Sequence, residues 1–118
     1  MAACVVVAGC GGGDDRPSRE DARRCLSQAG LHVTGGARSP DDRDAPDEEL
    51  IANDVRGGRV MVFVAYYDDE ERAERLEPSL RRNARRFDGF VERHGTLTLL
   101  WVRGERSRMG ERVRDCIL

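Results

Sequence analysis

Few side chains in this sequence combine a reactive or metal-ligating group with an informative position: Cys4, Cys10, Cys25, Cys116, His32 and His94. A cysteine can act as a nucleophile, bind a metal, accept a lipid or form a disulfide. Neither histidine has a cysteine or a second histidine at zinc-ligand spacing, and no Ser-His-Asp or Cys-His arrangement can be argued. We therefore predict no metal, no cofactor and no catalytic residues, and the cysteines become the main source of information.

Cys10 follows a short segment, residues 1–9, that carries no charged side chain. The stretch Val7-Ala8-Gly9-Cys10 resembles a bacterial lipobox, in which small residues precede a lipidated cysteine. The resemblance implies that residues 1–9 are a signal-peptide remnant, that Cys10 carries the lipid anchor (palmitate included) and that residues 10–17 are a flexible tether. A secretory signal has a positive n-region and about 7–15 apolar residues. Residues 1–9 lack the positive region, and their apolar run is at the short limit. We therefore expect the true start of the protein to lie upstream of Met1.

Two other interpretations of this segment remain open. Residues 5–8 could form a strand that leads into a nucleotide-binding glycine loop at residues 9–13. Such a loop needs a helix N-terminus at the phosphate, whereas Asp14 and Asp15 would repel it and Pro17 delays the helix. The other interpretation is the first strand of a cytosolic protein. We favour export, with a soluble secreted form as the nearest alternative to the anchored one.

Cysteine counting predicts one disulfide in the mature domain. If Cys4 leaves with the signal and Cys10 is acylated, Cys25 and Cys116 remain as an even pair. Disulfides persist in the oxidising cell envelope and are rare in the cytosol. Closing a loop of this length would contribute about 4–5 kcal/mol on the chain-entropy model. The alternative is two unpaired core thiols, since both cysteines lie on apolar faces of predicted helices.

Composition limits the possible partners. A chain of 118 residues is one domain, which we place at residues 18–118. The net charge of −2 argues against nucleic acid as an obligate partner. All 20 basic residues are arginine. They are spread along the chain, which indicates a genome rich in G and C rather than selection for phosphate contacts.

Apolar periodicity predicts the elements that would position these residues. Helices are expected over residues 19–29, from an N-cap at Asp68 to Phe87 with a kink or break at Pro78, and from Met109 to the C-terminus. Strands are expected at 31–34, 59–67, 90–93 and 96–103, and 49–53 is ambiguous between a strand and a helical turn. The strand at 59–67 is apolar on both alternations, which marks a central strand. His94-Gly95 is the expected hairpin turn.

This order predicts an α+β fold: an antiparallel sheet of about 4–5 strands with three helices packed mainly on one face. The disulfide would join the first and last helices. They must then be neighbours on the same side of the sheet.

Several motifs together resemble a known kind of protein. They are the sequence from Cys25 to Leu31 (Cys-Leu-x-x-Ala-Gly-Leu), the Val91-x-x-His94-Gly95 hairpin and the terminal Val-x-x-Cys-Ile-Leu from Val113. With the tethered cysteine, the pattern resembles small secreted or lipoprotein domains of actinobacteria that have no assigned biochemistry. The resemblance implies a location and a framework, and it implies no activity.

Two charged clusters are candidates for ion contact. Arg81, Arg82, Arg85 and Arg86 could contact anionic lipid headgroups or wall phosphate polymers. The alternative, which we favour, is a solvated helix face paired to Glu74 and Glu77. The acidic loop at 41–48 lacks the glycine and spacing of a calcium loop, so we expect it to be solvated.

We expect a cell-envelope lipoprotein domain that is a non-enzymatic binding or interaction module. Its partners would be the membrane surface and an envelope protein or polymer. One alternative is a small enzyme or sensor with a polar site of Glu92, His94 and Arg103 around the last hairpin. Another is a structural homodimer that uses an exposed sheet face. Aromatic residues of the central strands (Phe63, Tyr66, Tyr67 and Trp101) could line a pocket or a dimer face, although such residues are more often core.

Overall fold

The computed structural model describes residues 16–35, 45–54 and 58–118. The elements follow one another as α2 (Arg19–Gln28), β2 (Leu31–Thr34), β3 (Glu48–Asp54), β4 (Arg59–Tyr66), α3 (Glu70–Arg85), β5 (Phe90–His94), β6 (Leu97–Trp101) and α4 (Arg108–Ile117). This order is the one that the sequence predicts, and the ambiguous segment at 49–53 is a strand. The fold is α+β.

The five strands form one sheet in the order β2-β3-β4-β6-β5, and every neighbouring pair is antiparallel. Strand β4 lies at the centre, as its apolar sequence predicts. The last hairpin turns at Gly95, whose φ of 65° lies in the left-handed region that favours glycine. His94 is therefore the last residue of β5 and not part of the turn, which corrects one expectation.

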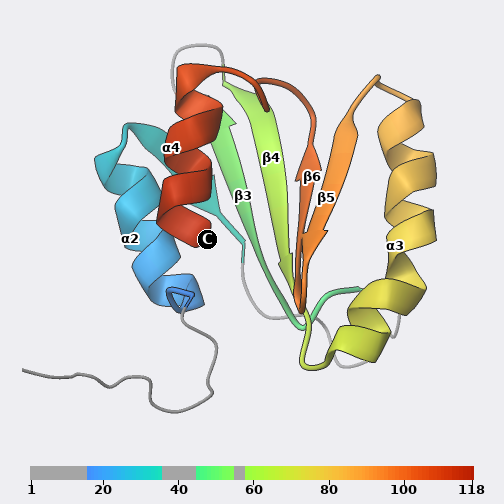
Figure 1. The fold of residues 1–118 in the computed structure, drawn as a ribbon. Coiled ribbons are helices and arrows are strands. Elements are labelled where there is room, and N and C mark those ends of the chain that lie inside the picture. Colours follow the sequence, from blue (N-terminus) through green and yellow to red (C-terminus); the bar gives the residue numbers. More distant parts are fainter. Residues whose placement is uncertain (1–15, 36–44, 55–57) are drawn as a thin grey trace, which may run out of the picture.

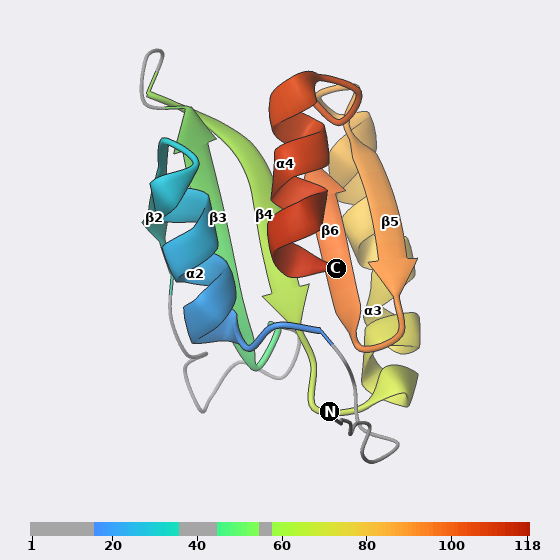
Figure 2. The ribbon, with the colours of Figure 1, turned by 60° about the vertical axis from the view of Figure 1, so that its left-hand side comes forward.

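The helices cover both faces of the sheet. Helices α2 and α4 lie side by side on one face, and α3 lies on the other (Figures 1 and 2). The expected placement on one face is thus correct for α2 and α4, whereas α3 packs on the opposite face. Along β4, Val62 and Val64 belong to the core under α2 and α4, and Phe63 and Ala65 belong to the α3 side.

Local sequence signals define the ends of α2 and α4. The Ser18 side chain accepts a hydrogen bond from the Asp21 amide, and that of Ser107 accepts one from the Gly110 amide. Each satisfies one of the free amides of a first helical turn. Gly30 follows α2 with a φ of 97°, as expected for the residue after a helix.

Helix α3 begins one residue later than expected. Its N-cap is Asp69, whose side chain accepts from the Arg72 amide at 2.7 Å, and not Asp68. The Asp68 amide instead donates to Asp47 at 2.7 Å, and Arg72 forms an ion pair with Asp47 at 2.6 Å. These contacts with the segment before β3 fix the start of the helix. Pro78 lies within α3 without splitting it; the helix bends along its length (Figure 1).

A β-bulge lies in the pairing between β3 and β4. Asn53 pairs with Val60 and Ala52 pairs with Val62, so Met61 is the extra residue. The Met61 carbonyl accepts hydrogen bonds from the amides of Val102 and Arg103. Because of the bulge, the Met61 side chain joins the core under α2 and α4.

Candidate functional site

Cys25 and Cys116 form a disulfide, with their Cα atoms 5.5 Å apart and 91 residues of sequence separation. Cys25 lies in α2 and Cys116 in the last turn of α4. Cys116 is 5% exposed and joins the main hydrophobic core. The predicted bridge between the first and last helices is therefore confirmed, and neither cysteine is available as a nucleophile or ligand.

Cys10 lies outside the described residues, as do residues 41–44 of the acidic loop. The described members of that loop take part in structural ion pairs. Asp47 binds Arg72 on α3, and Glu48 binds Arg19 on α2 at 3.2 Å. These carboxylates hold the start of β3 to two helices.

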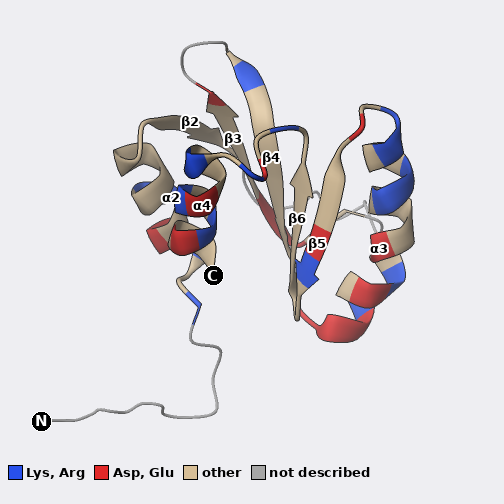
Figure 3. Ribbon diagram, turned by 45° about the horizontal axis from the view of Figure 1, so that its top comes forward, with Lys and Arg blue, Asp and Glu red and all other residues tan. Residues whose placement is uncertain are grey.

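The basic cluster lies in the second half of α3 and just after it. Arg81, Arg82, Arg85 and Arg86 are all exposed. Figure 3 shows acidic residues in the first half of this helix and basic residues in the second. That arrangement suits the helix dipole. Arg81 pairs with Glu77 at 2.6 Å, as the i,i+4 spacing predicts. Within the described part of the chain, the side chains of Arg82, Arg85 and Arg86 make no ion pair or hydrogen bond.

The residues proposed for a site around the last hairpin do not form one group. Glu92 is bound by Arg114 of α4 through two hydrogen bonds of 2.9 and 3.2 Å. The His94 Nε2 atom lies 3.7 Å from the Glu92 carboxylate. Arg103 instead pairs with Asp54, at the end of β3. The geometry therefore separates Arg103 from the other two.

The contacts around Glu92 are those of a structural ion pair. The Arg114 guanidinium also lies 4.8 Å from the Trp101 ring centroid. Burial by itself raises the pKa of Glu92, but the hydrogen bonds and charge of Arg114, helped by Trp101 and His94, bring that pKa below its usual value. A carboxylate held ionised against an arginine is a poor general acid or base near neutral pH. The pair fastens α4 to β5.

His32 also lies outside any cluster. It is exposed on β2, as its alternation with Leu31 and Val33 predicts. Within the described residues, no group of three or more His, Cys, Asp and Glu side chains is placed to hold a metal ion.

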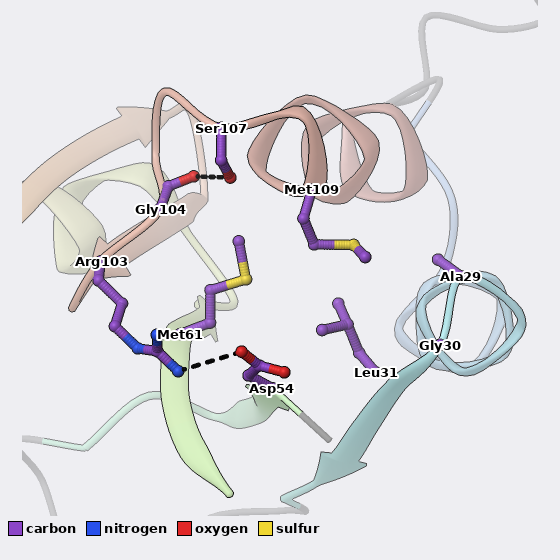
Figure 4. A pocket seen from close by; sticks show the side chains of 9 residues that line it. All are labelled: Ala29, Gly30, Leu31, Asp54, Met61, Arg103, Gly104, Ser107 and Met109. Carbon is purple, nitrogen blue, oxygen red and sulfur yellow. Dashed lines mark hydrogen bonds and ion pairs between the residues drawn. The ribbon is translucent and has the colours of Figure 1, made fainter. Parts of the chain in front are cut away.

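The Arg103–Asp54 pair borders a cavity of about 590 Å³ at one end of the sheet (Figure 4). The cavity lies between the end of α2, the start of α4 and the bulge of β4. Figure 4 shows the side chains of Met61 and Met109 directed into it. The Arg103 and Asp54 charges lie 3.5 Å apart. The cavity thus offers apolar walls and an ion pair whose two charges offset each other.

A second cavity, of about 440 Å³, lies between α3 and the sheet. We call it the α3 cleft. Its apolar lining includes residues of the sheet and the helix, and its polar lining includes one buried hydroxyl and two groups of opposite charge. The sheet contributes Phe63, Ala65, Leu100, Thr98 and Glu49 to this lining, and Arg86 lines the cleft just after α3.

Sequence reasoning missed this cleft, although one signal pointed to it. Thr98 interrupts an otherwise apolar strand and alternates with Leu97 and Leu99, so it faces the side opposite to them. Thr98 is fully buried, and its Oγ1 atom has no hydrogen-bond partner among the described residues. Phe63 and Tyr67 line the same cleft, whereas Trp101 and Tyr66 pack into the core under α2 and α4. The four aromatic residues therefore do not form one surface.

Comparisons with protein-family models, with curated proteins and with solved structures find no match to this chain. In the described ranges, none of the helices has the length and apolar character needed to cross a membrane.

Proposed function

We propose that this chain is an exported, non-enzymatic binding domain of the bacterial cell envelope, anchored by a lipid on Cys10. The observation that carries the proposal is the disulfide between Cys25 and Cys116. Disulfides form and persist in oxidising compartments, and small exported domains rely on them because their cores are limited. A bridge that joins the first and last helices is suited to a domain that works outside the cytosol.

Binding rather than catalysis is supported by the use of the charged groups. Glu92 is held by Arg114, and Arg103 pairs with Asp54. These groups already have partners within the fold, so they do not converge on a reacting atom. The α3 cleft has the form of a binding site instead, since ligand cavities are concave, largely apolar and of about 300–1,000 Å³.

The lipid anchor is tested by expressing the gene with its own upstream region in a bacterial host supplied with labelled palmitate. We expect the protein to take up the label and to fractionate with membranes. Cys10→Ala should lose the label and release the protein. Cys4→Ala is the matched control, because a cysteine within the signal segment would not be the acylated residue.

The compartment is tested by thiol titration of the protein purified from that host and denatured. We expect Cys25 and Cys116 to be unreactive until a reductant is added. An unlabelled protein in the soluble cell fraction, with both thiols free, would contradict the proposal.

A further inference from the structure

We propose that the α3 cleft binds an anionic amphiphile, with an apolar body on the sheet and an acidic group at Arg86. This inference rests on the proposed function of a binding domain and names the chemistry of its ligand. Both a free fatty acid and an anionic phospholipid have this chemistry.

Packing differs between the two faces of the sheet. Under α2 and α4, buried residues from both helices and four strands form one continuous cluster. Under α3 there are two separate clusters, one around Tyr67 and Leu76 and the other around Ala84 and Leu100. Helix α3 contacts mainly β5 and β6, so the side of the sheet toward β3 is less covered. The cleft is the space that this incomplete packing leaves.

Apolar groups form the floor of the cleft. Phe63, Ala65 and Leu100 line it from the sheet, and Leu76 and Leu80 line it from α3. Phe63 is only partly buried, although it lies on the central strand. A hydrocarbon chain or ring that covers these side chains would remove apolar surface from water, at about 25 cal/mol for each Å².

Thr98 gives the floor a polar point. It pairs across the sheet with Ala65, whose small side chain leaves space beside the hydroxyl. A buried hydroxyl without a partner costs about 1–3 kcal/mol. A ligand oxygen within reach of Thr98 Oγ1 would recover that cost, which favours an amphiphile with an ester or hydroxyl group in its body over one with a plain hydrocarbon body.

Charge at the cleft determines the orientation of the ligand. Arg86 lines the cleft at the C-terminal end of α3, and within the described residues its side chain has no carboxylate partner. Glu49 lines it from β3. An anionic group would therefore lie at Arg86 and away from Glu49. A cationic amphiphile would be repelled by Arg86 and attracted by Glu49.

The test uses the oxidised full chain and isothermal calorimetry with dodecanoate below its micelle-forming concentration. We expect saturable binding at one site, with dodecylammonium weaker by about tenfold, the scale of one charge-assisted contact. Vesicles that contain an anionic phospholipid form a second arm. Binding to these vesicles and not to dodecanoate assigns the ligand to the membrane, and the reverse result assigns it to a free acid.

Three variants distinguish binding in the cleft from a general effect of surface charge on affinity. Arg86→Gln should weaken dodecanoate binding by about tenfold, and Glu49→Gln should strengthen it. Arg85→Gln is the matched control: it removes the same charge from the neighbouring exposed residue, which does not line the cleft, and affinity should be unchanged. Equal losses in the Arg85 and Arg86 variants would overturn the proposal.

Two further variants test the floor. Thr98→Val keeps the shape and removes the hydroxyl, so the anionic phospholipid, whose ester oxygens lie in the body of the molecule, should bind about three- to tenfold more weakly. Dodecanoate, whose only oxygens lie at Arg86, should bind with unchanged affinity. Ala65→Leu should fill the cleft and abolish binding in a protein whose circular dichroism spectrum is unchanged. Unaltered binding by a folded Ala65→Leu protein would overturn the proposed location.

Failure here is distinguishable from failure of the proposed function. If the folded wild-type protein binds neither dodecanoate nor anionic vesicles, the proposed ligand is wrong. The results of palmitate labelling and membrane fractionation do not depend on that outcome. Light scattering on the wild type and on Ala65→Leu measures the oligomeric state of each protein. A dimer that dissociates in Ala65→Leu would show that a second copy of the chain, and not an amphiphile, occupies the cleft.

Discussion

Reduction of the Cys25–Cys116 disulfide should cost this domain a large part of its stability. The bridge closes a loop with a sequence separation of 91 residues. On the chain-entropy model, opening such a loop lowers the free energy of the unfolded chain by about 4.6 kcal/mol at 25 °C. Small domains have unfolding free energies of only about 5–15 kcal/mol. The reduced protein should therefore be marginally stable.

Reduction should change the free energy of the native state only slightly. The Cα separation of 5.5 Å lies in the usual range for a disulfide, so the helices need not move to be bridged. Core packing of α2 and α4 through Leu26, Val113 and Ile117 remains after reduction. A loss of about 4 kcal/mol corresponds to a fall in Tm of roughly 15–25 °C for a domain of about 100 residues.

Urea unfolding with and without a reductant measures this loss directly. The double variant Cys25→Ala/Cys116→Ala, studied without reductant, is the control. It should match the reduced wild type apart from the lost packing of the buried Cys116 sulfur. If reduction lowers the unfolding free energy by less than about 1 kcal/mol, the bridge does not restrain the unfolded chain as the chain-entropy model requires.

Three further predictions concern α4 and its contacts. Arg114 lowers the pKa of Glu92 in the folded protein. The ionised carboxylate therefore stabilises the fold fully at pH values above its ordinary pKa of 4.5, and this stabilisation is lost as the pH falls through the lower pKa of the folded state. Glu92→Gln should remove that acid dependence in urea titrations from pH 3 to pH 6, and an unchanged profile would contradict the assignment. Gly110→Ala should lower Tm, although alanine usually favours helices, because its Cβ would clash with the Gly104 carbonyl oxygen; a raised Tm would refute this. Ser107→Ala should cost about 1 kcal/mol in urea unfolding through loss of the N-cap, and no change would show that the cap contributes nothing.

Local signals in the sequence predicted most of the elements. Ser18 and Gly30 mark the ends of α2 because capping depends on a few neighbouring residues. Leu97, Leu99 and Trp101 alternate along β6, so they share the face that packs under α2 and α4, because successive side chains of a strand point to opposite faces. Counting cysteines predicted the disulfide. The caps and the alternation depend on residues that are close in sequence, and the cysteine pairing is limited to one choice once Cys4 and Cys10 are assigned to the signal and the lipid anchor.

Contacts between distant segments decided the rest. Two neighbouring acids could each cap α3, and the ion pair of Arg72 with Asp47 favours Asp69 as the N-cap. His94 was expected in the turn, but its pairing with Leu97 of β6 makes it the last residue of β5. The extra residue at Met61 depends on the register between β3 and β4.

By itself, the sequence indicated most of the helices and strands and the apolar side of each, and it named Cys25 and Cys116 as the pair that remains once Cys4 and Cys10 are assigned to the signal and the lipid anchor. Apolar periodicity reports that a face is buried, but it does not report what covers it. Only the tertiary structure decided that α3 lies on the opposite face from α2 and α4, that Arg103 pairs with Asp54 away from Glu92, and that a cleft remains over Thr98. These features depend on how well two surfaces fit together, and that fit is set by residues far apart in the chain.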